Sequence, residues 1–231
     1  MRVCRIDLAT PERRVRAKTR LLSQPATDKA GQRKTSIVSY FPTRKGGSRM
    51  ERLRHYAHRS LAALLETDPQ VLKWTTETET LVLGERWSFT PSFWVVEHHR
   101  HVAIRVLRAG ILKNARNEER HHAVRGAYGR LGVAFEVRTE EDVKTDPRLS
   151  VAEEILWHRP RDIPAGMALQ VGTMAAAPPA TLGELHARLG GAADTWPLMI
   201  AMVAQGRIEL ENTDCLDAET RVLACRMRGH V

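Results

Sequence analysis

The chain has 231 residues, of which 42% are hydrophobic and 27% are charged, values that exclude wholesale disorder and predict one large or two small globular domains. The longest apolar run, residues 196–204, is far shorter than the ~20 residues of a membrane span, and the N-terminus has too many charges for a signal peptide. We therefore expect no membrane partner and a cytoplasmic location. Three cysteines without CxxC spacing predict neither a disulfide framework nor a Cys-rich zinc site.

Positive charge is concentrated at the N-terminal end. The chain contains 36 Lys or Arg and 27 Asp or Glu, and residues 1–54 hold 15 of the basic residues but only 4 of the acidic ones. Because much of this segment is poor in large apolar side chains, we expect residues 1–39 to form a basic, flexible arm that binds phosphates, with a solubilising tail as the alternative. The predicted DNA contacts in and just after the arm are Arg13, Arg14, Arg16, Lys18, Arg44, Lys45 and Arg49.

A helix is predicted to follow the arm. Apolar residues recur there at spacings of three and four, at Met50, Leu53, Ala57, Leu61 and Leu64. Ser48 would be its N-cap and Glu51 its third residue, the pattern of a capping box. Asp68-Pro69 would end this helix.

Short segments rich in β-branched or aromatic residues then predict strands, at 71–74, 80–83, 87–89, 93–97 and 102–107. A tight polar turn over 98–101 would join the last two. Further on we expect a helix over 117–131 ended by Gly132, a strand over 133–138, and a short helix capped by Thr139 and Asp142. Together these elements predict an α/β domain over residues 40–160.

The C-terminal part is predicted to form a second, smaller domain. Prolines and an AAAPPA run indicate a linker over residues 161–180. Thr181-Leu-Gly-Glu184 is a capping box that opens one helix, and a second helix begins at Asp194 or Thr195 and ends at Gly206. Strands over 207–210 and 220–226 complete the order of a small winged-helix domain over 181–231, a fold that binds either DNA or protein.

The order of elements and several motifs resemble the TnsA-type transposon-end endonucleases, which carry a PD-(D/E)xK nuclease domain followed by a winged helix. Glu51, in Ser48-Arg-Met-Glu51, stands where the family has an acid near the start of its first core helix. Ser92, in Thr90-Pro-Ser92-Phe93, replaces the family's Asp. Arg105 and Leu107 occupy the positions of an acidic residue or Gln and of a Lys. The resemblance covers roughly residues 40–225 and implies a restriction-endonuclease-like mixed sheet flanked by helices, followed by a small winged-helix domain.

The substituted positions predict a protein that has lost the family's chemistry. Mg²⁺ requires oxygen ligands, chiefly carboxylates, but Ser92 offers only a neutral oxygen and Arg105 places a permanent cation at the expected metal position. Leu107 cannot supply the positive charge of a Lys. We therefore expect a DNA-binding, nuclease-degenerate subunit of a transposition or other mobile-element complex, without metal or cofactor. The resemblance implies a DDE-type transposase and an ATPase regulator as partners.

Several alternatives remain open from the sequence. Arg105 is predicted to bind the DNA backbone, or instead to form an ion pair with Glu51. The chain could be an active Mg²⁺-dependent endonuclease in which Glu77 or Glu79 supplies a displaced carboxylate, or a non-enzymatic assembly scaffold or regulator. Histidines in 97–101 and 118–122 suggest a surface turn and a surface helix more than a metal site. Three tryptophans could stack on bases, but core packing is the default expectation for them: Trp87, Trp94 and Trp157. Three arginines of the second domain could contact phosphates, and a protein contact is equally compatible with them: Arg188, Arg207 and Arg221.

Overall fold

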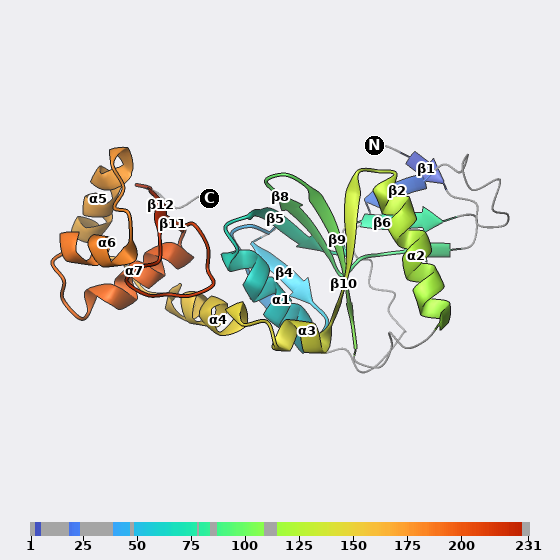
Figure 1. Cartoon of the computed structure of the whole chain (residues 1–231), viewed down its shortest axis with the longest axis horizontal. Helices are drawn as coiled ribbons and strands as arrows, with labels where there is room; N and C mark the ends of the chain where they lie inside the picture. Colours follow the sequence, from blue (N-terminus) through green and yellow to red (C-terminus); the bar gives the residue numbers. More distant parts are fainter. Residues whose placement is uncertain are drawn as a thin grey trace. The chain divides into compact units, whose positions relative to one another are not determined.

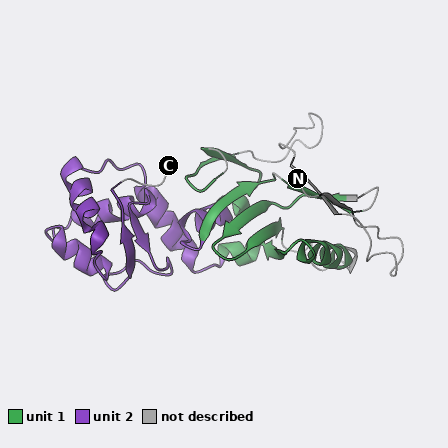
Figure 2. Cartoon of the chain, turned by 90° about the horizontal axis from the view of Figure 1, so that it is seen from above, with its two compact units in different colours: residues 1–59, 71–144 green, residues 60–70, 145–231 purple. Residues whose placement is uncertain are grey.

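The computed structural model describes residues 3–5, 19–23, 39–46, 49–77, 79–83, 87–108 and 115–227 (Figure 1). The chain separates into two compact units, residues 1–59 with 71–144 (unit 1) and residues 60–70 with 145–231 (unit 2), which Figure 2 colours separately. Helix α1 (Tyr56–Thr67) begins in unit 1 and ends in unit 2. Both units contain helices and strands, so the predicted α/β class is confirmed.

Unit 1 is built on a mixed four-stranded sheet with the order β10-β9-β8-β5. Strands β5 (Val71–Thr76), β8 (Phe93–Glu97) and β9 (His101–Leu107) are antiparallel, whereas β10 (Val133–Thr139) runs parallel to β9. A parallel pair needs a crossover connection, which helix α2 (Ala115–Gly129) supplies by packing against β10 (Figure 1). The predicted strands and helix of this region are confirmed, as is the turn after β8.

Side chains alternate between the two faces of this sheet. Trp94 and its register partner Ala103 pack on the face that holds the buried Tyr128 of α2. Phe93 lies on the other face, where its ring contacts His58 in the first turn of α1 at a centroid distance of 5.4 Å. Helical side chains therefore cover both faces.

A second four-stranded sheet in unit 1 has the order β1-β2-β6-β7 and is antiparallel throughout. Its β6 (Glu79–Leu83) and β7 (Trp87–Phe89) confirm the predicted strands. The prediction of an unstructured arm is wrong for β1 (Val3–Arg5) and β2 (Thr19–Ser23). β1 pairs with β2, and β2 pairs with β6, some sixty residues away, a partner that the composition of the arm cannot reveal. The four basic arm residues predicted to contact DNA lie outside the described residues: Arg13, Arg14, Arg16 and Lys18.

The predicted helix start near Ser48 is also wrong. Met50–Leu53 is a strand, β4, that pairs antiparallel with β3 (Ser39–Pro42), and α1 begins only at Tyr56. Burial along β4 alternates, with Glu51 and Leu53 buried and Met50 exposed. Within this strand, Met50 and Leu53 are three residues apart, which is also a helical spacing. Because the apolar residues of α1 continue that spacing, the strand resembled the first turn of the helix.

Short helix α3 (Glu140–Lys144) ends unit 1 and has the predicted cap. The backbone N–H of Thr139 donates to Asp142 Oδ2 at 2.7 Å, and the N–H of Asp142 donates to Thr139 Oγ1 at 3.0 Å. These reciprocal bonds satisfy two backbone donors that the first turn of a helix leaves without intrahelical partners.

Unit 2 includes the segment 161–180, and the prediction that this segment is a linker is wrong. After α4 (Arg148–His158), the chain forms α5 (Ala165–Thr173) and a 3₁₀ turn, η3 (Met174–Ala176). Val171 of α5 is fully buried in the core of unit 2. The prolines that suggested a linker all lie outside the helix, and Pro164 directly precedes its first residue, where proline is compatible with helix initiation.

The rest of unit 2 contains α6 (Leu182–Arg188), α7 (Thr195–Ala204) and the hairpin of β11 (Ile208–Leu210) and β12 (Val222–Cys225), all close to their predicted positions. The Thr181 hydroxyl caps α6 by accepting from the Glu184 N–H at 3.2 Å. Thr181 also forms an isolated bridge to Arg221, which adds a third extended segment beside β12. Among the described residues, no helix has the length and apolarity needed to cross a membrane.

Candidate functional site

Two of the positions on which the resemblance rests, Ser92 and Arg105, meet at one end of the mixed sheet of unit 1. Phe93 pairs with Ile104, so Ser92 lies beside Arg105 of the neighbouring strand, and its N–H donates to Ile104 O at 2.8 Å. The Ser92 hydroxyl is buried, with 3% of the residue exposed, and accepts from the Val106 N–H at 3.0 Å. The Ser92 oxygen therefore extends the pairing of β8 with β9.

Glu51 lies near the same end of the sheet. Its Oε2 accepts from both the N–H and the hydroxyl of Thr76, at 3.2 and 3.0 Å, and Thr76 is the register partner of Phe93. Glu51 is 7% exposed, on β4 rather than on a helix. Its carboxylate thus holds β4 against the end of β5, which is a structural role that the sequence does not predict.

Arg105 is partly buried at this site. Its Nη1 donates to Thr90 O at 3.3 Å, and its guanidinium carbon lies 5.7 Å from the centre of the Phe89 ring. Burial lowers the pKa of Arg105, and the nearby Glu77 carboxylate opposes this shift. Among the residues that the structure describes, no ion pair joins Arg105 to Glu51, so that alternative is wrong.

These side chains do not fit a Mg²⁺ site. The Ser92 oxygen accepts a backbone hydrogen bond, Arg105 adds positive charge, and Leu107 is a buried apolar residue, 6% exposed. In the described segments, no three His, Cys, Asp or Glu side chains are grouped as a metal site would require. These residues therefore lack the ligands to hold a divalent ion at this position.

Glu77 is the acid whose charge acts on Arg105. Its backbone φ is +48°, a conformation uncommon for residues other than glycine and found preferentially at functional sites. Its carboxylate pairs with Arg54 at 2.5 Å. The other proposed displaced ligand, Glu79, lies on β6, where burial raises its pKa. Glu77 is thus held in an ion pair and Glu79 has a raised pKa, so neither carboxylate is a free metal ligand.

The charge of Arg105 acts on His58 and His121, and the His58 ring lies 5.2 Å from that of His55. We call the group of Arg54, His55, His58, Glu77, Arg105 and His121 the Arg105 cluster. Burial lowers the pKa of His58 to about 4, and positive charge from His55 and Arg105 acts in the same direction. Burial also lowers the pKa of His55, assisted by Arg108, and that of His121 on α2, assisted by Arg105. The cluster is therefore a concentration of arginine charge against neutral imidazoles.

Two arginines at this site have exposed side chains, Arg54 and Arg108. The side chain of Arg54 is 50% exposed although it pairs with Glu77, and that of Arg108, just after β9, is 63% exposed and lies 3.9 Å from Glu140. An exposed guanidinium can exchange a carboxylate partner for a phosphate oxygen, which it binds through two parallel hydrogen bonds. Arg54 of the cluster and the neighbouring Arg108 thus have the chemistry to bind an anion without a metal ion.

The remaining basic positions predicted near the site lie on the β3–β4 hairpin. Lys45 O accepts from the Trp74 N–H at 2.9 Å, which anchors the loop of Arg44 and Lys45 to β5. Arg49 is exposed directly before β4. The structure thus places all three in unit 1.

The sequence did not identify Arg54, His55, His58 or Arg108 as site residues. Arg54 and His55 follow a strand that looked helical, so neither seemed to be at a turn. His58 lies between Ala57 and Leu61 on the buried side of α1. Its place among apolar residues was the one feature of the sequence that could have identified it as a site residue. Arg108 was visible only as the residue after a strand.

The three arginines of unit 2 that could contact phosphates have acidic or backbone partners. Arg188 pairs with Glu184 and Arg221 with Glu211, while Arg207 Nη1 donates to Met227 O at 2.7 Å. The tryptophans differ from one another: Trp94 packs against the core around Tyr128, whereas Trp157 is 78% exposed. Core packing is therefore wrong for Trp157.

The histidine-rich segment after β8 is a charged turn. Arg100 Nε donates to Glu97 Oε2 at 2.6 Å, and Arg100 Nη2 lies 3.3 Å from Glu136 Oε1 on β10. Glu97, the only carboxylate in the segment 97–101, is therefore paired with Arg100.

Compared with protein-family models and with curated proteins, the chain matches none.

Proposed function

We propose that the chain is a DNA-binding, nuclease-degenerate protein similar to TnsA-type endonucleases and acts in a transposition or other mobile-element complex. The observation that carries this proposal is the meeting of Ser92 and Arg105 at one end of the mixed sheet. A nuclease of this family would need an acid at the first position and an acid or Gln at the second. This chain has a backbone-bound hydroxyl and a guanidinium instead.

The order of elements supports the proposed scaffold. Helix α1, the strands β5 to β9, the crossover helix α2 and the parallel strand β10 follow one another, which is the order on which the resemblance rests. In unit 2, two helices precede a two-stranded hairpin, and Thr181 bridges to Arg221 beside that hairpin. This arrangement supports a winged helix.

The charges of unit 1 support DNA as the ligand. The Arg105 cluster and the exposed Arg108 lie in the unit that contains the basic N-terminal segment, where residues 1–54 have a net charge of +11. Binding through such side chains releases counterions and is therefore strongly salt-dependent. A DDE-type transposase and an ATPase regulator are the protein partners that the resemblance proposes.

The decisive experiment incubates purified full-length chain with supercoiled plasmid and with linear duplexes, in Mg²⁺, Mn²⁺ or EDTA. We expect retardation of DNA in all three conditions and no nicking in any. Nicking that requires metal and disappears in Glu51→Ala would show an active endonuclease, whereas absence of retardation at low salt would favour an assembly scaffold.

A further inference from the structure

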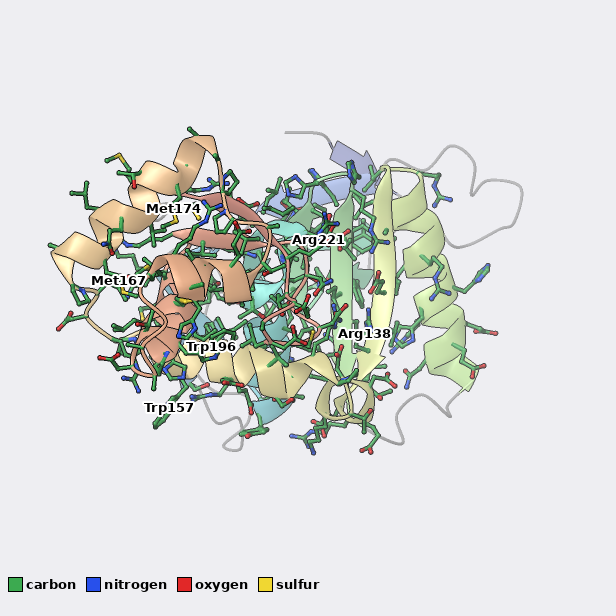
Figure 3. All side chains as sticks on the ribbon, turned by 60° about the vertical axis from the view of Figure 1, so that its left-hand side comes forward. Arg138, Trp157, Met167, Met174, Trp196 and Arg221 are labelled. Carbon is green, nitrogen blue, oxygen red and sulfur yellow. The ribbon has the colours of Figure 1, made fainter. Side chains whose placement is uncertain are left out.

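The exposed Trp157 marks a second surface, on helix α4 of unit 2. It is the most exposed large apolar side chain among the described residues, at 78%. Figure 3 shows its ring pointing away from the ribbon. An indole so exposed gains nothing from core packing, and exposed aromatic side chains are concentrated at protein contacts.

Helix α4 holds this side chain on a rigid support. Ala152 and Ile155 are buried on one side of the helix, and Ile155 belongs to the apolar core of unit 2. Glu153, Glu154 and Trp157 are exposed. Residues three and four apart are neighbours on a helix surface, so both carboxylates lie within one turn of the indole.

Neither carboxylate is neutralised by a neighbour. In the described part of the chain, Glu153 and Glu154 form no ion pair. Burial and then Arg161 lower the pKa of His158, and the Glu154 carboxylate opposes this shift. Arg161, the next exposed cation along the chain, donates from Nε to His158 Nδ1 at 2.8 Å. Negative charge beside Trp157 is therefore uncompensated.

The rest of unit 2 argues against nucleic acid as the partner. Residues 145–231 contain 8 Arg, no Lys and 11 Asp or Glu, a formal charge of −3. Four of these acids lie in the loop between β11 and β12, at Glu211, Asp214, Asp217 and Glu219. Helix α7, which follows α6 where a DNA-reading helix would lie, has no charged residue and no exposed one. A phosphate backbone would be repelled from this unit.

We propose that Trp157, Glu153 and Glu154 form a docking surface for a Lys- or Arg-bearing segment of another protein. A cation placed over the indole face is attracted by the ring, and the two carboxylates attract the same cation or its neighbours. The proposal concerns unit 2 alone and does not depend on DNA binding by unit 1. It identifies a surface and the chemistry of the partner.

The test measures binding of a short fluorescent oligo-arginine peptide to the full-length chain by fluorescence anisotropy. Trp157→Ala is expected to weaken binding about tenfold, Trp157→Phe less, and Glu153→Gln with Glu154→Gln about tenfold with a smaller salt dependence. The matched control is Leu169→Ala, because Leu169 is 58% exposed on α5 and should leave the affinity unchanged. All substituted side chains are exposed, so melting temperatures should remain equal.

Duplex DNA and vesicles of anionic lipid are the competing ligands. We expect the Trp157 and glutamate variants to retard DNA as the parent chain does and to differ from it in peptide binding alone. Equal peptide affinity in the parent chain and in Trp157→Ala would overturn the proposal. So would a loss of DNA or vesicle binding in Trp157→Ala, which would assign the surface to a different ligand. Failure of the parent chain to bind DNA leaves this test intact.

Discussion

Glu51 and Thr76 form a buried pair in which one carboxylate oxygen accepts from both the N–H and the hydroxyl of the threonine. The pair joins β4 to the last residue of β5, and Thr76 itself is 9% exposed. A buried backbone donor that loses its acceptor costs about 1–3 kcal/mol. The acid that the family resemblance identifies as catalytic therefore has a structural task in this chain.

This arrangement predicts different outcomes for two substitutions of Glu51. Glu51→Ala removes the acceptor and should lower the free energy of unfolding by about 1–3 kcal/mol, measured by urea denaturation. Glu51→Gln keeps an oxygen acceptor and should cost less than about 1 kcal/mol. Equal losses in the two variants would mean that the charge itself is required.

The Arg105 cluster predicts the DNA-binding behaviour of Arg105→Gln. Loss of one phosphate contact should weaken binding to all sequences alike and reduce the slope of log affinity against log salt by about 1. Arg54→Gln should act in the same way, because Arg54 carries the cluster's charge to the surface. The measurement is a titration of fluorescent duplex at several salt concentrations.

Arg221→Gln is the matched control for the arginine substitutions. Its side chain is 70% exposed, more than that of Arg54, but it belongs to the acidic unit 2. We expect its affinity and salt slope to equal those of the parent chain. A loss at Arg221 as large as at Arg105 would show that net charge alone determines binding.

The buried imidazole of His58 predicts that stability falls in acid. Its folded-state pKa of about 4 is below its ordinary value of 6.5, so the unfolded chain binds this proton first. The contribution of the neutral His58 to the free energy of unfolding is complete above pH 6.5 and is lost as the pH falls towards 4. The loss is about 1.4 kcal/mol per pH unit and roughly 3 kcal/mol in all. Burial lowers the pKa of His55 too, which acts in the same direction.

His58→Leu tests this assignment. The variant keeps an apolar contact with Phe93 but cannot take up a proton, so its unfolding free energy should depend less on pH between 6.5 and 4. The measurement is urea denaturation at several pH values in that interval. A parent chain and variant with the same pH dependence would place the responsible proton elsewhere.

The sequence predicted elements better where the signal is local. The predicted caps at Thr139 and Thr181 depend on partners three residues away, and in both the threonine hydroxyl accepts the expected backbone N–H. The pairing of β2 with β6 depends on a partner some sixty residues away, and it was missed. The strand at Glu51 was missed because its apolar residues fit the spacing of the helix that follows. In the site, the sequence identified Ser92 and Arg105 as candidate residues. It could not predict the hydrogen bond from Val106 to Ser92 or the effect of the Glu77 charge on Arg105, because both depend on the folded chain.

Tyr128 predicts a stabilising substitution in the core of unit 1. The residue is fully buried, its ring stacks on Phe135 at 5.8 Å, and its hydroxyl has no hydrogen-bond partner among the described residues. A buried hydroxyl without a partner costs about 1–3 kcal/mol relative to water. Tyr128→Phe keeps the ring and should raise the unfolding free energy by roughly 1 kcal/mol. A destabilised variant would indicate that the hydroxyl has a partner in solution.

Gly183 predicts a destabilising substitution in unit 2, because α6 approaches the loop before β12 closely there. The Gly183 N–H donates to Ala218 O at 2.8 Å, and a Cβ on Gly183 would lie 2.9 Å from that oxygen and 3.0 Å from Ala218 Cβ. Since a backbone oxygen cannot rotate away as a side chain can, Gly183→Ala should cost about 1–3 kcal/mol. Gly166→Ala is the matched control on α5, where a Cβ would meet no atom within 4 Å. There alanine's higher helix propensity should stabilise unit 2 by up to about 1 kcal/mol, so calorimetry should show melting shifts of opposite sign for the two variants.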